Sequence, residues 1–135
     1  MKIDGGCHCG FIKFEAEADP DKVMICHCTD CQTLSGTAFR TFLPIRRDDF
    51  KLLSGEPKTY VKTGDSGRKR AQTFCPECGA PLYATGVGEE DTKYYNLRLG
   101  IARQRDRLPP KREVWCRSAL PWLPESEGTT KVEKQ

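Results

Sequence analysis

Seven of the eight cysteines in this sequence form three close groups, and thiolates at such spacings are typical zinc ligands. In chain order the groups are Cys7 and Cys9; Cys26, Cys28 and Cys31; and Cys75 and Cys78. The eighth cysteine, Cys116, stands alone. In a secreted chain eight cysteines would suggest four disulfides, whereas close pairs in a cytosolic chain suggest metal. We therefore predict metal sites rather than a disulfide framework.

The first and third groups together predict one closed zinc site. Cys75 and Cys78 are separated by two residues and followed by Gly79, the pattern of a zinc knuckle, in which the glycine takes a positive φ. Cys7 and Cys9 would point to the same side of an extended segment. Four thiolates complete a tetrahedral structural site, so we prefer this interpretation to two ordinary core cysteines near the N-terminus.

The second group predicts a zinc site with an open position. Cys26 and Cys28 follow the apolar run VMI and share one face of an extended segment. Cys31 then returns to the same cation from a turn or short helix, which the Thr29 hydroxyl could cap. Three thiolates leave one coordination position, and a catalytic zinc keeps that position for water or substrate. The spacing therefore favours a zinc site whose fourth position is open to water or substrate.

Three residues are candidates for a fourth protein ligand at this second site. His27 lies between two ligands and should point away from their face, and His8 has the same relation to Cys7 and Cys9. Cys116 is the stronger candidate, because eight cysteines divide into two sites of four. The alternative for Cys116 is a buried free thiol, which is common in proteins. We favour the open position and leave Cys116 as the alternative.

Short strands with frequent turns are expected to carry these groups. The only helical segments that we predict are one or two turns at 29–35 and one turn near 46–49. Alternating apolar and polar residues, β-rich composition and turn residues mark the expected strands. These are 11–18, 37–45, two strands in 50–64 joined at SGEP, 68–75, 80–86, 93–102 and 112–123.

Length and composition predict one domain over residues 1–123. A chain of 135 residues suits a single domain, and the last 12 residues, which have almost no apolar side chains, predict a disordered tail at 124–135. No apolar run could span a membrane or act as a signal peptide, so we expect a cytoplasmic protein. The net charge of +3 favours a small anionic substrate over nucleic acid. The sequence does not determine the oligomeric state, and a homo-oligomer is compatible with it.

The motifs resemble the glutathione-dependent formaldehyde-activating enzyme family, which includes centromere protein V. The resemblance spans about residues 3–123 and rests on GGCHCGFIKFE, CHCTDCQTLSGTAF, the TFCPECGAPLY region and the closing PPKREVWCRSALPWL. It implies a mainly β fold of small coiled antiparallel sheets held by zinc. It also implies structural zinc at the first site, catalytic zinc at the second, and therefore two zinc ions per chain.

The resemblance implies a zinc-dependent carbon–sulfur lyase that acts on the adduct of glutathione and formaldehyde, S-hydroxymethylglutathione. A small thiol such as glutathione would bind the open position as a thiolate. Basic residues would hold the carboxylates of the tripeptide, and the candidates are Arg40, Arg68, Arg70 and Arg98. The alternative function is a non-catalytic zinc module that binds protein or nucleic acid, and a second alternative is a purely structural two-zinc protein.

Overall fold

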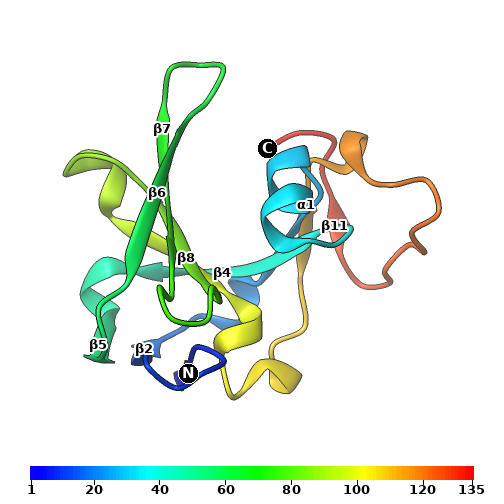
Figure 1. The fold of residues 1–135 in the computed structure, drawn as a ribbon. Helices are drawn as coiled ribbons and strands as arrows, with labels where there is room; N and C mark the ends of the chain where they lie inside the picture. The colour runs from blue at the N-terminus through cyan, green and yellow to red at the C-terminus, as the bar shows by residue number, and fades with distance from the viewer.

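The computed structural model describes residues 1–135, which form a mainly β protein with two sheets and a single α-helix (Figure 1). The smaller sheet has the order β1-β2-β5 and is antiparallel throughout. Its strands are β1 (Lys2–Gly6), β2 (Lys13–Glu17) and β5 (Phe50–Ser54). The predicted fold class is confirmed.

The larger sheet has the order β11-β10-β3-β4-β9-β8-β7-β6. Its pairs are antiparallel except that β10 runs parallel to both β3 and β11. Its strands are β3 (Met24–Cys26), β4 (Arg40–Arg46), β6 (Lys58–Thr63), β7 (Lys69–Phe74), β8 (Pro81–Gly86), β9 (Tyr94–Arg98), β10 (Arg112–Val114) and β11 (Thr130–Lys131).

The helical segments are short, and two of them lie where the sequence predicts helical turns. Helix α1 spans Thr29–Ser35, and a 3-10 turn, η2, spans Arg47–Asp49. Five further 3-10 turns connect strands: η1 (Pro20–Lys22), η3 (Glu90–Thr92), η4 (Leu99–Ile101), η5 (Arg105–Arg107) and η6 (Cys116–Ser118). None of the helices has the length and apolar character needed to cross a membrane.

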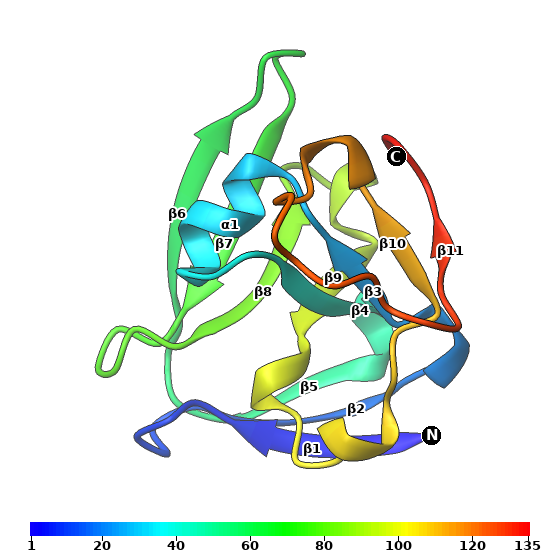
Figure 2. The same cartoon turned by 90° about the vertical axis from the view of Figure 1, so that its right-hand side faces the viewer.

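Helix α1 lies between the β6–β7 hairpin on one side and strands β10 and β11 on the other (Figures 1 and 2). The Lys62 ammonium on β6 contacts the Asp30 carboxylate on α1 at 2.5 Å, which links the hairpin to the helix. Helix α1, the β6–β7 hairpin and the segment after β10 come from distant parts of the sequence, and all three contribute residues to the cleft described below.

The apolar core is divided into three parts, and two of them contain cysteine groups. The main cluster packs β2, β4 and β9 residues such as Phe14, Leu43 and Leu97, all 1% exposed or less. A second cluster includes Cys7 and Cys75, and a third includes Cys26, Cys31, Phe42 and Val114. The main cluster has only ten buried residues. The two cysteine-containing clusters therefore provide much of the packing outside it.

The last 12 residues differ from the disordered tail that their composition predicts. Thr130 and Lys131 form β11 beside β10, and the backbone N–H groups of Trp115, Cys116 and Arg117 donate to the carbonyls of residues 134, 132 and 133. The side chains along this segment are mostly exposed, so its low apolar content did not indicate that the segment is ordered. Its order comes from backbone pairing with distant residues.

Candidate metal centres and the adjoining cleft

The first cysteine group is assembled from the end of β1 and the β7–β8 turn. The sulfur atoms of Cys7, Cys9, Cys75 and Cys78 all lie within 4.8 Å of one another. Cys7 Sγ and Cys9 Sγ are 3.6 Å apart, and Cys9 Sγ and Cys75 Sγ are 3.9 Å apart. Zinc with Zn–S bonds of about 2.3 Å holds tetrahedral sulfurs roughly 3.8 Å apart. The four-sulfur group therefore fits a zinc ion.

Backbone geometry prepares this first group for negative charge. Gly79 has φ 78°, the positive value that the knuckle requires, and its N–H donates to the Cys75 carbonyl at 2.8 Å. Backbone N–H groups, foremost that of Ala80 and then that of Cys9, lower the pKa of Cys78 to about 6. The Ile12 N–H donates to Cys7 Sγ at 3.2 Å. These dipoles stabilise thiolates, which are the form that binds metal.

The second group lies where β3 ends and α1 begins. The sulfurs of Cys26, Cys28 and Cys31 lie within 4.8 Å of one another. Cys28 is the N-cap of α1, and its Sγ accepts the Cys31 N–H at 3.4 Å. The expectation that Thr29 caps the helix is therefore wrong, because Thr29 is already inside the first turn. A candidate metal ligand performs the capping role instead.

Charge in this second group is concentrated on one sulfur. Hydrogen bonds from the Cys26 and then the Cys31 thiol lower the pKa of Cys28 to about 2. Hydrogen bonding with Cys28, then with Cys31, and then burial raise the pKa of Cys26. At Cys31 the contact with Cys26 lowers the pKa, but the contact with Cys28 and burial raise it more, so the net pKa is raised. These directions favour a thiolate at Cys28 and thiols at Cys26 and Cys31, whose protons a bound cation would displace.

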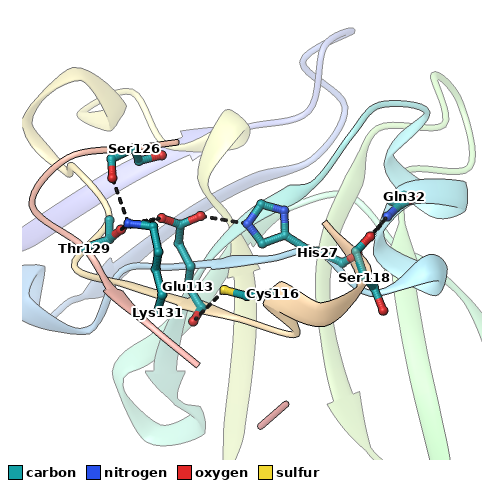
Figure 3. A network of polar contacts seen from close by, with 8 residues as sticks. All are labelled: His27, Gln32, Glu113, Cys116, Ser118, Ser126, Thr129 and Lys131. Carbon is teal, nitrogen blue, oxygen red and sulfur yellow. Dashed lines mark hydrogen bonds and ion pairs between the residues drawn. The ribbon is translucent and has the colours of Figure 1, made fainter. Parts of the chain in front are cut away.

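The three candidates for a fourth ligand do not join this second group. His8 is exposed next to the first group. His27 is 3% exposed, and its Nε2 is 2.7 Å from Glu113 Oε1, on the side that alternation predicts. Cys116 lies with His27 and Glu113 within 4.8 Å, and its thiol donates to the Glu113 carbonyl at 3.7 Å (Figure 3). The second group contains three sulfurs and no further protein donor.

A cleft of about 520 Å³ opens over the second group. Its walls come from the β6–β7 hairpin, β4, β8, β9, α1 and the segment after β10. The three cysteines line it together with Asp30, Arg40, Phe42, Gly64, Ser66, Arg68, Arg70, Gln72, Ala84, Asn96, Arg98, Trp115 and Gln135. The four arginines proposed from the sequence are therefore brought together at one site, although they are far apart along the chain.

The buried arginines in this cleft have no carboxylate partner. Arg40 and Arg98 are 9% and 7% exposed, and neither forms an ion pair, nor does Arg70. Arg98 donates to the neutral Gln72 Oε1 at 3.0 Å, and Arg40 Nε has no partner. Burial, and then the charge of Arg40, lowers the pKa of Arg98. An anion in the cleft would offset this unfavourable charge.

Sequence reasoning did not identify several of the residues that shape the site. The Glu113 contact with His27 joins residues 86 positions apart, and nothing local indicates it. Gln72, Asn96 and Trp115 line the cleft for the same non-local reason. Trp115 has φ 57° and is the only non-glycine residue with positive φ, a conformation that costs about 1–3 kcal/mol and occurs often at functional sites.

The fold and the cysteine geometry define a small β protein with two thiolate-rich centres, each of which could hold a metal ion. Residues 2–118 match the family model of the glutathione-dependent formaldehyde-activating enzymes, and the chain belongs to that family. A crystal structure of a Rhodobacter sphaeroides protein has a similar fold, with a TM-score of 0.57 and 17% sequence identity. The match covers 98% of this chain and 99% of that protein.

Proposed function

We propose that this protein is a carbon–sulfur lyase that acts on a small thiol adduct such as S-hydroxymethylglutathione. The observation that supports the proposal best is the position of Cys26, Cys28 and Cys31 at a cleft that also contains four arginines. Family membership supports glutathione and formaldehyde as the related substrates. Three sulfurs without a fourth protein donor suit a site that accepts an external thiol.

We assign two zinc ions per chain. Cys7, Cys9, Cys75 and Cys78 would hold a structural ion, because four thiolates complete its coordination. Cys26, Cys28 and Cys31 would hold the catalytic ion. All eight cysteines are free of disulfides, which agrees with the reducing cytoplasm that we propose as the compartment.

The reaction needs a thiolate, an anchored substrate and a proton donor or acceptor. When bound, zinc supplies a soft cation that lowers the pKa of the substrate thiol. In the forming direction the thiolate sulfur attacks the carbonyl carbon, a C–S bond forms, and the C=O π pair moves to oxygen, which takes a proton from water. The lyase direction is the reverse: the hydroxyl loses its proton, the C–S bond breaks and formaldehyde leaves.

This chain's own residues would orient the substrate during that reaction. The guanidinium groups of Arg40, Arg70 and Arg98 are suited to bind carboxylates, because planar N–H donors match carboxylate oxygens. Asn96 and Gln72 line the same cleft and offer neutral hydrogen bonds to an amide-containing thiol. Burial of Arg40 and Arg98 inside the cleft favours a small ligand over a nucleic acid or protein surface, the alternative function.

The test combines zinc-edge X-ray absorption with NMR on protein of known zinc content, with and without glutathione and formaldehyde. We expect Cys116→Ala to keep two zinc ions, and added glutathione to raise the average sulfur count around zinc. NMR should show the hydroxymethyl adduct forming or breaking faster than without protein. Loss of one zinc in Cys116→Ala, with a spectrum that glutathione leaves unchanged, would instead mean a closed structural site and would overturn the proposal.

A further inference from the structure

His27 occupies the position between two of the three sulfurs and is fixed at several points. Its N–H donates to the Val114 carbonyl at 3.1 Å, and its carbonyl accepts from Gln32 Nε2 at 2.8 Å. The ring is buried, with Nε2 directed at Glu113. Because His27 is flanked by Cys26 and Cys28, the orientation of its peptide units sets the direction of both sulfur-bearing side chains.

Glu113 is the partner that fixes the His27 ring, and Figure 3 shows the other contacts that hold it. Oε1 lies 2.7 Å from His27 Nε2. Oε2 accepts a short hydrogen bond from Thr129 Oγ1 and lies 3.6 Å from the Lys131 ammonium. Glu113 is 4% exposed, so its carboxylate depends on these three partners in place of water.

Two of those partners belong to a segment that we call the C-terminal strap, residues 126–134. Lys131 is itself held by the Ser126 carbonyl at 2.9 Å and by Thr129 Oγ1 at 3.2 Å. The strap also accepts the backbone N–H groups of residues 115–117, which include the strained Trp115 of the cleft wall. One exposed segment thus contacts both the support of His27 and the backbone of Trp115.

We infer that the C-terminal strap positions the second cysteine group, and that Glu113 is the positioning residue through which it acts. Contacts run from Thr129 and Lys131 to Glu113 and then to His27, and the backbone of His27 joins it to Cys26 and Cys28. Partners that hydrogen-bond a metal ligand directly change metal affinity about 10- to 100-fold, so we expect the lower end of that range for Glu113, which acts through a neighbouring residue. This inference rests on the proposed metal-binding role of Cys26, Cys28 and Cys31.

The same trio, His27, Glu113 and Cys116, has the donor types of a metal site. Two features favour positioning instead. The His27 Nε2–Glu113 Oε1 separation of 2.7 Å is that of a direct hydrogen bond, and the Lys131 ammonium already neutralises the carboxylate. A cation between these donors would have to break the His27–Glu113 hydrogen bond. The two readings differ in the number of zinc ions bound, which the test below measures.

The experiment follows zinc release from the full-length, zinc-loaded protein to a coloured chelator. We expect two phases, with the faster from the second group. Glu113→Ala should accelerate that faster phase about tenfold or more and leave the slower phase unchanged. Thr129→Val should accelerate it less, in the same direction. In cobalt-substituted protein, both variants should shift the thiolate-to-cobalt charge-transfer bands, which a purely structural defect far from the ligands would not move.

A double-mutant cycle and a matched control decide whether the strap acts through Glu113. If it does, Thr129→Val has no further effect on release in the Glu113→Ala background. The control is Thr85→Val, which removes another partly buried threonine hydroxyl bond, 2.8 Å to the Tyr94 carbonyl, at a residue that does not line the cleft. It should leave both release phases and the cobalt bands unchanged. If Glu113→Ala does not fold, the zinc-release rates of Thr129→Val and Thr85→Val are compared instead, and only Thr129→Val should accelerate the faster phase.

Four results would overturn the inference. Unchanged release in both Glu113→Ala and Thr129→Val would show that the strap does not position the group. Equal acceleration by Thr129→Val with and without Glu113 would mean that it does not act through Glu113. A third zinc, lost in Glu113→Ala, would make the trio a metal site. Absence of any metal at the second cysteine group would overturn the proposed function as well, whereas the first two results leave it standing.

Discussion

At the scale of single residues, the chemistry depends on how three neighbouring thiols share charge. The Cys26 and then the Cys31 side chain lower the pKa of Cys28, and its Sγ also accepts the Cys31 N–H, so negative charge is most favourable on this sulfur. The pKa of Cys26 is raised by hydrogen bonding to the neighbouring sulfurs, by burial and then by charge repulsion. At Cys31 the contact with Cys26 lowers the pKa, but hydrogen bonding to Cys28 and burial raise it more, so these two thiols favour their protonated forms. Metal binding must therefore remove two protons from this group.

Zinc affinity at the second group should consequently rise with pH. Protons compete with the metal for Cys26 and Cys31, so lowering the pH weakens binding and raising it strengthens binding. With two protons displaced, the logarithm of the apparent binding constant should increase by about two per pH unit between roughly pH 6 and 8. Competition titrations with a chelator of known pH dependence measure this slope. A slope near three would place a proton on Cys28 as well, and a slope near zero would contradict the charge distribution.

At the scale of elements, the first cysteine group joins the two sheets. Cys7 and Cys9 follow β1 of the three-stranded sheet, whereas Cys75 and Cys78 belong to the β7–β8 turn of the larger sheet. The apolar cluster around these sulfurs has only four buried residues, two of them cysteines. The proposed zinc would therefore replace apolar burial where the sheets meet.

Cys78→Ser should on this basis yield insoluble or unfolded protein. The serine hydroxyl is a poor zinc ligand, and loss of structural zinc removes folding free energy directly. Soluble yield, circular dichroism and thermal melting measure the effect. Cys116→Ser is the matched control, because Cys116 lies outside both sulfur groups, and it should fold and melt cooperatively. A Cys78→Ser variant that also melts cooperatively would show that the first site is dispensable for folding.

At the scale of the whole molecule, the fold places positive charge where stability alone would not. β4, β7 and β9 each direct arginine into one cleft, and Arg98 is buried there without a carboxylate. An unpaired buried charge is unfavourable for folding, and the neighbouring Cys31 and Cys26 sulfurs offset only part of it. This agrees with the anion-binding role that we propose for the cleft. Helix α1 and the β6–β7 hairpin enclose the same cleft.

Arg98→Met should separate binding from stability. The variant keeps an apolar stem of similar length and removes the buried charge, so its melting temperature should be unchanged or higher. Its KM for a carboxylate-bearing thiol adduct should rise about tenfold, the loss of roughly 1.4 kcal/mol, with little change for an uncharged adduct. Arg103→Met, on an exposed arginine that contacts Asp4, is the control. An unchanged KM for the anionic adduct would remove Arg98 from the binding site.

Local geometry explains what could be predicted from the sequence by itself. Cysteine spacing within six residues is enough to place sulfurs on one face of a strand or across one turn, and Gly79 takes the positive φ that its knuckle predicts. The short helix at 29–35 was likewise predicted, although its N-cap is Cys28 and not the expected Thr29. The family resemblance rests on these same local motifs, and the match over residues 2–118 confirms it.

Contacts between distant residues explain what only the tertiary structure decided. The grouping of Arg40, Arg70 and Arg98 depends on which strands become neighbours in the larger sheet. The parallel pairing of β10 and the contact between Glu113 and His27 depend on chain segments about 86 residues apart. The strap is polar and exposed, so composition predicts disorder, whereas its order in the structure comes from backbone hydrogen bonds to residues 115–117 and from the contacts of Thr129 and Lys131 with Glu113. Short-range sterics are encoded in a few adjacent residues, but strand partners are selected by the packing of the whole chain.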